Sequence, residues 1–113
     1  FNLFINLKEA NVLLGSRFSN NSIDASKAIF EKIKTETNLV VVTDGPNVAC
    51  GIDKKQIAKV KPDVIEENIS RSGAGDAFLA YFLSYKELNP DASLKESLSI
   101  ADEKTHIFLE TND

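Results

Sequence analysis

Hydrophobic residues along the chain form short continuous runs that alternate with longer stretches of helical spacing. The run at residues 39–42 is rich in β-branched side chains, which is typical of a strand covered on both faces, and residues 1–5 read as the end of another buried strand. Two further runs, 48–52 and 56–60, flank a turn and predict an antiparallel hairpin. Residues 63–65 predict one more short strand.

Three segments within the first 90 residues have apolar side chains at helical spacing. Residues 7–14 predict a short helix that ends at Gly15, because glycine is the usual residue after a helix C-cap. Residues 23–36 predict an amphipathic helix. Residues 75–88 predict a third helix, which Pro90 prevents from continuing.

Ser93 and Glu96 match the spacing of a capping box and predict a last helix through about residue 109. The resulting order of strands and helices is that of an α/β fold. In such folds ligands lie beyond the carboxyl ends of the strands, where helices begin.

Composition narrows the function classes. The chain has 113 residues, a net charge of −4 and 42% hydrophobic residues, which suits one globular domain. Its basic residues are scattered, so nucleic acid binding is not expected as the main role, and its apolar runs are too short to cross a membrane. The lone Cys50 excludes an intrachain disulfide, indicates a reducing cytoplasmic compartment and is expected to be a buried structural thiol.

The chain contains no methionine and starts at Phe1, so we expect an internal piece of a longer protein or one whose start was removed. The sole histidine, His106, is expected to be a surface or packing residue, because no nucleophile pattern accompanies it.

The candidate chemistry lies in residues 72–78, Ser-Gly-Ala-Gly-Asp-Ala-Phe. Gly73, Ala74 and Gly75 carry little side-chain bulk, and the helix that follows adds unpaired N–H groups and the positive end of its dipole. Together they favour a phosphate site, at which Asp76 would accept a proton from an attacking hydroxyl. A packing turn with an ordinary helix-start aspartate is an equally weighted interpretation of this heptapeptide.

This heptapeptide resembles the C-terminal signature D-T-T-G-A-G-D-x-F of the ribokinase-like (PfkB) carbohydrate kinases. Two upstream segments strengthen the resemblance: residues 6–9, Asn-Leu-Lys-Glu, are similar to the N-x-x-E motif of the family, and residues 40–45 are similar to its strand and T-x-G turn. The likeness extends over essentially the whole chain. It implies that residues 1–113 are the C-terminal nucleotide-binding and catalytic portion of a ribokinase-like domain, whose N-terminal substrate and lid part is absent.

The resemblance also implies a fold: part of a three-layer arrangement, with the C-terminal part of a mostly parallel sheet flanked by helices and a short antiparallel hairpin. For the reaction it implies ATP as co-substrate, Mg²⁺, and transfer of the γ-phosphoryl group to an alcohol of a sugar or nucleoside. Asp76 would be the general base, and the backbone of Gly73, Ala74, Gly75 and Asp76 the anion hole.

The remaining site residues follow from the same resemblance. Thr43, Gly45 and Asp102 would line the nucleotide site. Asn6 and Glu9 would organise Mg²⁺ and phosphate, mainly through water.

The signature departs from the family pattern at Ser70, Arg71 and Ser72. In several members the first Asp and the second Thr of the signature help to bind a monovalent cation, so activation by K⁺ is left open. Arg71 either clamps a phosphate or faces solvent.

The sequence therefore predicts the ATP-binding portion of a sugar or nucleoside kinase. Acceptor-binding residues of the family precede the N-x-x-E motif, so we expect no activity from this chain alone, and a homodimer is left open for the intact enzyme. The alternatives are a phosphate- or nucleotide-binding module without catalysis, and a generic α/β scaffold domain.

Overall fold

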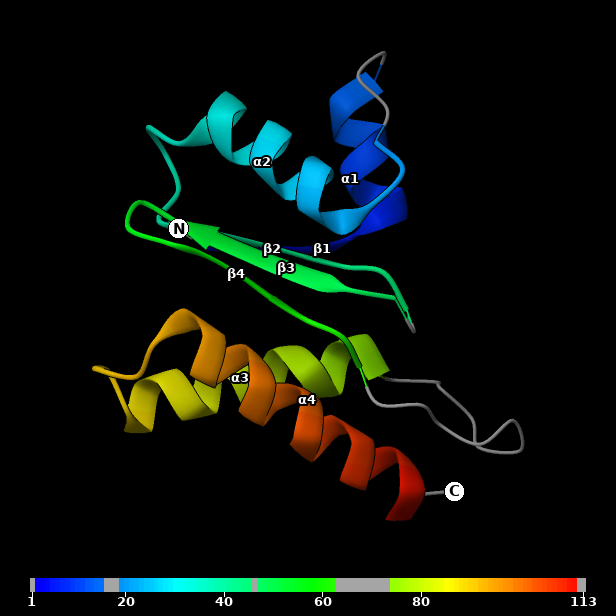
Figure 1. Cartoon of the computed structure of the whole chain (residues 1–113), viewed down its shortest axis with the longest axis vertical. Helices are drawn as coiled ribbons and strands as arrows, with labels where there is room; N and C mark the ends of the chain where they lie inside the picture. Colours follow the sequence, from blue (N-terminus) through cyan, green and yellow to red (C-terminus); the bar gives the residue numbers. More distant parts are fainter. Residues whose placement is uncertain (1, 16–18, 46, 63–73, 112–113) are drawn as a thin grey trace.

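The computed structural model describes residues 2–15, 19–45, 47–62 and 74–111, in which strands and helices follow one another in α/β order (Figure 1). The elements, in chain order, are β1 (Asn2–Asn6), α1 (Leu7–Leu14), α2 (Ser22–Ile33), β2 (Leu39–Thr43), β3 (Ala49–Asp53), β4 (Ile57–Val60), α3 (Ala74–Leu88) and α4 (Leu94–Thr111). The predicted α/β class is confirmed. The strand predicted at 63–65 lies outside the described residues.

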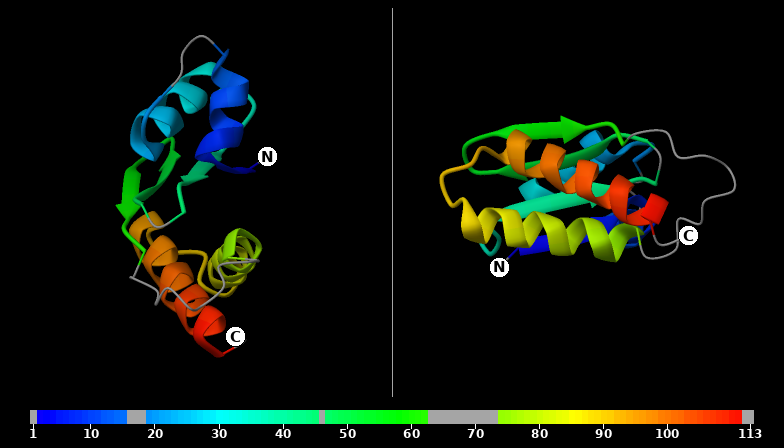
Figure 2. Two further views of the ribbon diagram at one scale, coloured as in Figure 1. Left: turned by 90° about the vertical axis from the view of Figure 1, so that its right-hand side faces the viewer. Right: turned by 90° about the horizontal axis from the view of Figure 1, so that it is seen from below.

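The molecule has three layers, with a four-stranded sheet between two pairs of helices (Figures 1 and 2). The strand order is β1-β2-β3-β4; β1 and β2 are parallel, whereas β2–β3 and β3–β4 are antiparallel. Helices α1 and α2 cover one face, and α3 and α4 cover the other. The predicted hairpin is therefore present as β3–β4, and the described sheet is mixed. None of the described helices has the length and apolar character needed to cross a bilayer.

Strand β2 holds the layers together because its side chains alternate between two buried clusters. Leu39 and Val41 pack against the α3–α4 side of the sheet, and Val40 and Val42 pack against the α1–α2 side. The three valines are fully buried. A strand buried on both faces explains the continuous apolar run in the sequence.

The larger cluster joins α3 to the sheet through two aromatic rings. Phe82 of α3 is 1% exposed, and its ring meets that of Phe4 in β1 edge to face, with centroids 5.1 Å apart at an interplanar angle of 63°. This edge-to-face geometry is the favoured one for aromatic pairs. The contact packs the middle of α3 against the middle of β1.

Both boundaries predicted for α2 need correction. Helix α2 starts one residue before the predicted 23, because the Asn21 side chain caps it by accepting from the N–H of Asp24 at 2.8 Å. It ends at Ile33 rather than 36, since the N–H groups of Glu36 and Thr37 both turn back onto the Ile33 carbonyl.

The capping box predicted at α4 is modified by a neighbouring helix. Ser93 Oγ accepts from the N–H of Glu96 at 3.0 Å, as predicted. The Glu96 carboxylate, however, accepts from the hydroxyl of Tyr85 at 2.6 Å, which ties α4 to α3. This bond raises the pKa of the Tyr85 phenol, because the phenolate would face a carboxylate.

Candidate functional site

The carboxyl ends of β1 and β2 lie side by side. The two strands are parallel, and their register pairs Asn6 with Thr43. Helix α1 begins directly after Asn6. Thr43 leads into a turn in which Gly45 has φ +53°, a left-handed conformation that favours glycine. Two of the predicted motifs therefore meet at one edge of the sheet.

Asn6 and Glu9 form a reciprocal capping box at the start of α1. Asn6 has an extended backbone, with φ −89° and ψ 170°, and its Oδ1 accepts from the N–H of Glu9 at 2.7 Å. Glu9 Oε1 in turn accepts from the N–H of Asn6 at 2.9 Å. Each residue thus satisfies a backbone donor of the other.

The third motif enters through the first turn of α3. Gly75 and Asp76 are exposed there, and no atom lies within 4 Å of a Cβ built on Gly75. The first N–H groups of a helix have no partner within the helix, and the dipole places partial positive charge beside them. Ala74 is half-buried at the start of the helix. Gly73 lies outside the described residues, as do Ser70, Arg71 and Ser72.

An open cavity of about 240 Å³ brings the three motifs together. Its lining comes from β1, α1, the end of β2 and the start of α3, and comprises Phe4, Ile5, Asn6, Glu9, Thr43, Gly75, Asp76, Phe78 and Leu79. Phe4 and Phe78 give it an apolar wall, whereas Glu9 and Asp76 supply two carboxylates. Residues far apart in the sequence thus share one cavity, which is lined by both apolar and charged side chains.

A second, smaller cavity of about 80 Å³ adjoins the first. It is lined by Thr43, Gly45, Ala49, Pro62, Ala74, Gly75, Phe78, Asp102 and Thr105. Thr43, Gly75 and Phe78 line both cavities. The three residues predicted for a nucleotide, Thr43, Gly45 and Asp102, therefore lie together in the smaller cavity.

The carboxylates of the larger cavity suit a hard cation that arrives with its own oxygen ligands. Glu9 and Asp76 both line the cavity, and the described residues contain no group of three or more His, Cys, Asp or Glu side chains able to hold a metal by themselves. Mg²⁺ is commonly bound through one or two carboxylates together with substrate phosphates. The side chains present therefore fit Mg²⁺ delivered with a phosphate ligand.

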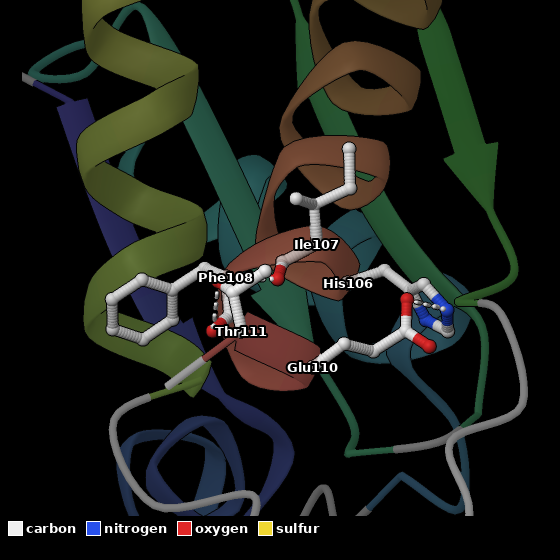
Figure 3. Close-up of polar contacts among 5 residues, drawn as sticks. All are labelled: His106, Ile107, Phe108, Glu110 and Thr111. Carbon is white, nitrogen blue, oxygen red and sulfur yellow. Dashed lines mark hydrogen bonds and ion pairs between the residues drawn. The ribbon is translucent and has the colours of Figure 1, made fainter. Parts of the chain in front are cut away.

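His106 has no part in either cavity. It lies on α4, where its Nε2 is 3.0 Å from the Glu110 carboxylate, and Figure 3 shows this pair on the side of the helix opposite Phe108. Its Nδ1 is buried without a hydrogen-bond partner in the described part of the chain. The prediction of a surface or packing role agrees with this position.

Cys50 is fully buried in β3, as predicted. Burial raises the pKa of its thiol, and the Ser26 hydroxyl and the ammonium groups of Lys27 and Lys59 oppose that effect. The residue lies away from both cavities.

Two features of the site were not predicted from the sequence. Thr105 lines the smaller cavity one helical turn after Asp102, a position that i,i+3 spacing on a helix would have indicated. The Asn6–Glu9 cap was also missed, although Asn-x-x-Glu before a helix fits the capping-box pattern.

The solved structures that are similar to this chain include a phosphofructokinase and an adenosine kinase. The phosphofructokinase-2 of Escherichia coli, in complex with fructose-6-phosphate, has a TM-score of 0.76 and 27% identity over 97% of this chain and 35% of its own. The adenosine kinase of Sinorhizobium meliloti has a TM-score of 0.73 and 21% identity over 96% of this chain and 31% of its own. A ribokinase II of E. coli, solved in complex with ATP and Mg²⁺, has a TM-score of 0.73 and 21% identity over 96% of this chain and 32% of its own. The chain thus spans about a third of the length of each.

No curated protein matches the chain. The model of the pfkB family of carbohydrate kinases matches residues 1–103, which is most of the chain and includes Asn6, Thr43 and Asp76. The resemblance drawn from the sequence motifs is confirmed, and the chain belongs to the pfkB carbohydrate kinase family.

Proposed function

We propose that this chain is the nucleotide-binding and catalytic portion of an ATP-dependent phosphotransferase. The γ-phosphoryl group of ATP would pass to an alcohol oxygen of a sugar or nucleoside. The observation that carries the proposal is the larger cavity, in which Glu9, Thr43 and Asp76 meet from three separate motifs.

Asp76 is proposed as the general base. Its carboxylate lies in the first turn of α3, at the helix end that attracts anions, where it would repel a bound phosphate. A chemical task would explain why a carboxylate occupies this position. Accepting the proton of the attacking hydroxyl is such a task. The backbone N–H groups of residues 73–76 would stabilise the negative charge on the transferred group.

The nucleotide is proposed to occupy the smaller cavity, with its phosphates passing Thr43 and Gly75 into the larger one. These two residues line both cavities, so they mark where the two spaces join. Gly45 and Asp102 would line the nucleotide end. Mg²⁺, when bound, would neutralise charge on the phosphates. Asn6 and Glu9 are the residues proposed to hold it through water.

The acceptor class rests on the named relatives, one in complex with fructose-6-phosphate and one an adenosine kinase. The chain spans about a third of their length, and we propose that the acceptor site is completed by an N-terminal part. The chain alone is then expected to bind ATP and to transfer no phosphate to ribose, fructose or a nucleoside. Robust turnover by the chain alone would refute that part of the proposal.

Calorimetric titration of the chain with ATP and Mg²⁺ tests the nucleotide site. Thr43→Val keeps the shape of the side chain and removes its hydroxyl, and should weaken ATP binding by about tenfold, as expected for one hydrogen bond to a charged group. Thr35→Val, at an exposed residue outside both cavities, is the matched control. Equal affinities of the two variants would contradict the proposed site, whereas ATP binding without turnover in the intact enzyme would favour a non-catalytic module.

A further inference from the structure

A third cavity, of about 170 Å³, lies between α2 and the β3–β4 hairpin. It is lined by Ile23, Lys27, Cys50, Ile57, Ala58 and Lys59, and none of these residues lines the larger or the smaller cavity. Ala49 and Cys50 are consecutive residues of β3, yet Ala49 lines the smaller cavity and Cys50 the third. Because successive side chains of a strand point to opposite faces, the sheet separates the third cavity from the smaller one.

The register of the hairpin and the spacing along α2 explain why these side chains gather. Lys59 of β4 lies directly opposite Cys50 of β3. Ile57 is two residues before Lys59 and so points to the same face of the sheet. Ile23 and Lys27 are four residues apart on α2, which places both on one side of that helix. The third cavity forms where this side of α2 meets the edge of the described sheet.

Two ammonium groups meet at this cavity, and in the described part of the chain neither has a carboxylate partner. The acidic residues of α2 nearest to Lys27 are Asp24 and Glu31, and each is bonded to another side chain, at 3.0 Å and 2.9 Å respectively. Lys27 and Lys59 both act on the thiol of Cys50, where they oppose the rise in its pKa that burial causes. Two like charges that reach the same group repel each other, and an anion bound between them would remove that repulsion.

We propose that the third cavity binds a small oxyanion that carries a short apolar group, such as an alkyl phosphate or a short-chain carboxylate. Lysine is a point charge with three rotatable donors, so it accepts phosphate and carboxylate oxygens alike. Ile23 and Ile57 supply the apolar wall, and Ile57 is 45% exposed, so a ligand would cover apolar surface there. The volume slightly exceeds the about 150 Å³ that is enough for a benzene-sized molecule.

Titration of the chain with butyl phosphate, followed by amide chemical shifts in NMR spectra, tests the proposal. The amides of Ile23, Cys50 and Lys59 should shift, with a dissociation constant in about the millimolar range. Inorganic phosphate and butanol, which each lack one half of the ligand, should bind about fivefold more weakly or less. Pentanoate is titrated in parallel, and whichever of the two anions binds more tightly identifies the head group. Shifts confined to the larger cavity, around Gly75 and Asp76, would overturn the proposal.

Two lysine variants test whether the charges hold the ligand. Lys27→Gln and Lys59→Gln each remove one charge from the cavity and should weaken the binding of butyl phosphate by about fivefold. Lys104→Gln, the same change at an exposed residue of α4 that does not line the cavity, is the control and should leave the affinity unchanged. Unchanged affinity in both cavity variants, or an equal loss in the control, would overturn the assignment.

Discussion

Gly51 of β3 lies against Leu98 of α4 so closely that a Cβ on the glycine would be 3.2 Å from Leu98 Cδ1. The same Cβ would be 3.4 Å from Cδ1 of Leu94. Both leucines are buried in the cluster between α4 and the sheet. The missing side chain at Gly51 therefore lets α4 pack directly on β3, and α4 carries Asp102 and Thr105 to the smaller cavity.

Gly51→Ala should lower the free energy of unfolding by about 1 kcal/mol or somewhat more, the cost of an added methyl in a close-packed core. Gly75→Ala is the matched control, because nothing lies within 4 Å of its Cβ and alanine suits a helix better than glycine. Urea unfolding curves of the two variants measure the difference. A Gly51→Ala chain as stable as the wild type would show that α4 does not press on β3.

Asn6→Ala should lower the free energy of unfolding by about 1 kcal/mol, because it removes the N-cap acceptor of α1. Asn6→Ser should stay within a few tenths of a kcal/mol of the wild type, since serine caps about as well as asparagine. Chemical denaturation of both variants gives the comparison. Equal losses in the two would mean that something other than the cap fixes the start of α1.

Cys50 should make the fold less stable in alkaline solution. Its pKa in the folded chain is raised above the ordinary value of 9.0, chiefly by burial. The unfolded chain therefore loses the thiol proton first as pH rises, so the stabilisation is complete below pH 9.0 and is lost as pH rises through the folded pKa. Cys50→Ala removes this loss.

The measurement for Cys50 is the free energy of unfolding of both chains on either side of pH 9.0. Tyr85 also titrates in alkaline solution, with a pKa raised above 10.0, but it is common to both chains and cancels in the comparison. Identical pH profiles would show that the thiol is not buried in solution.

The sequence predicted those parts of the fold whose signals are local. The run 39–42 and Gly15 marked a buried strand and a helix end, and both are where they were expected. The end of α2 was placed too late, because the turn onto Ile33 depends on backbone bonds that no side-chain pattern encodes. The Tyr85–Glu96 bond was also beyond local patterns, since it joins different helices.

The candidate site was predicted from family motifs, not from geometry. The resemblance named Thr43, Gly45 and Asp102 together, and the structure places all three on one cavity. It did not separate the two cavities, because each cavity is lined by residues from several elements and no local pattern marks its limits.

The general base is the central claim, and Asp76→Asn tests it most directly. The measurement is the rate of phosphoryl transfer from ATP to an alcohol in a full-length enzyme that carries these residues, with ATP affinity determined alongside. Asp91→Asn, the same change at an exposed residue that lines neither cavity, is the control. Asp76→Asn should lower the rate by roughly 10²–10⁴ while ATP still binds, and Asp91→Asn should leave it unchanged. Near-normal turnover in Asp76→Asn would contradict the assignment.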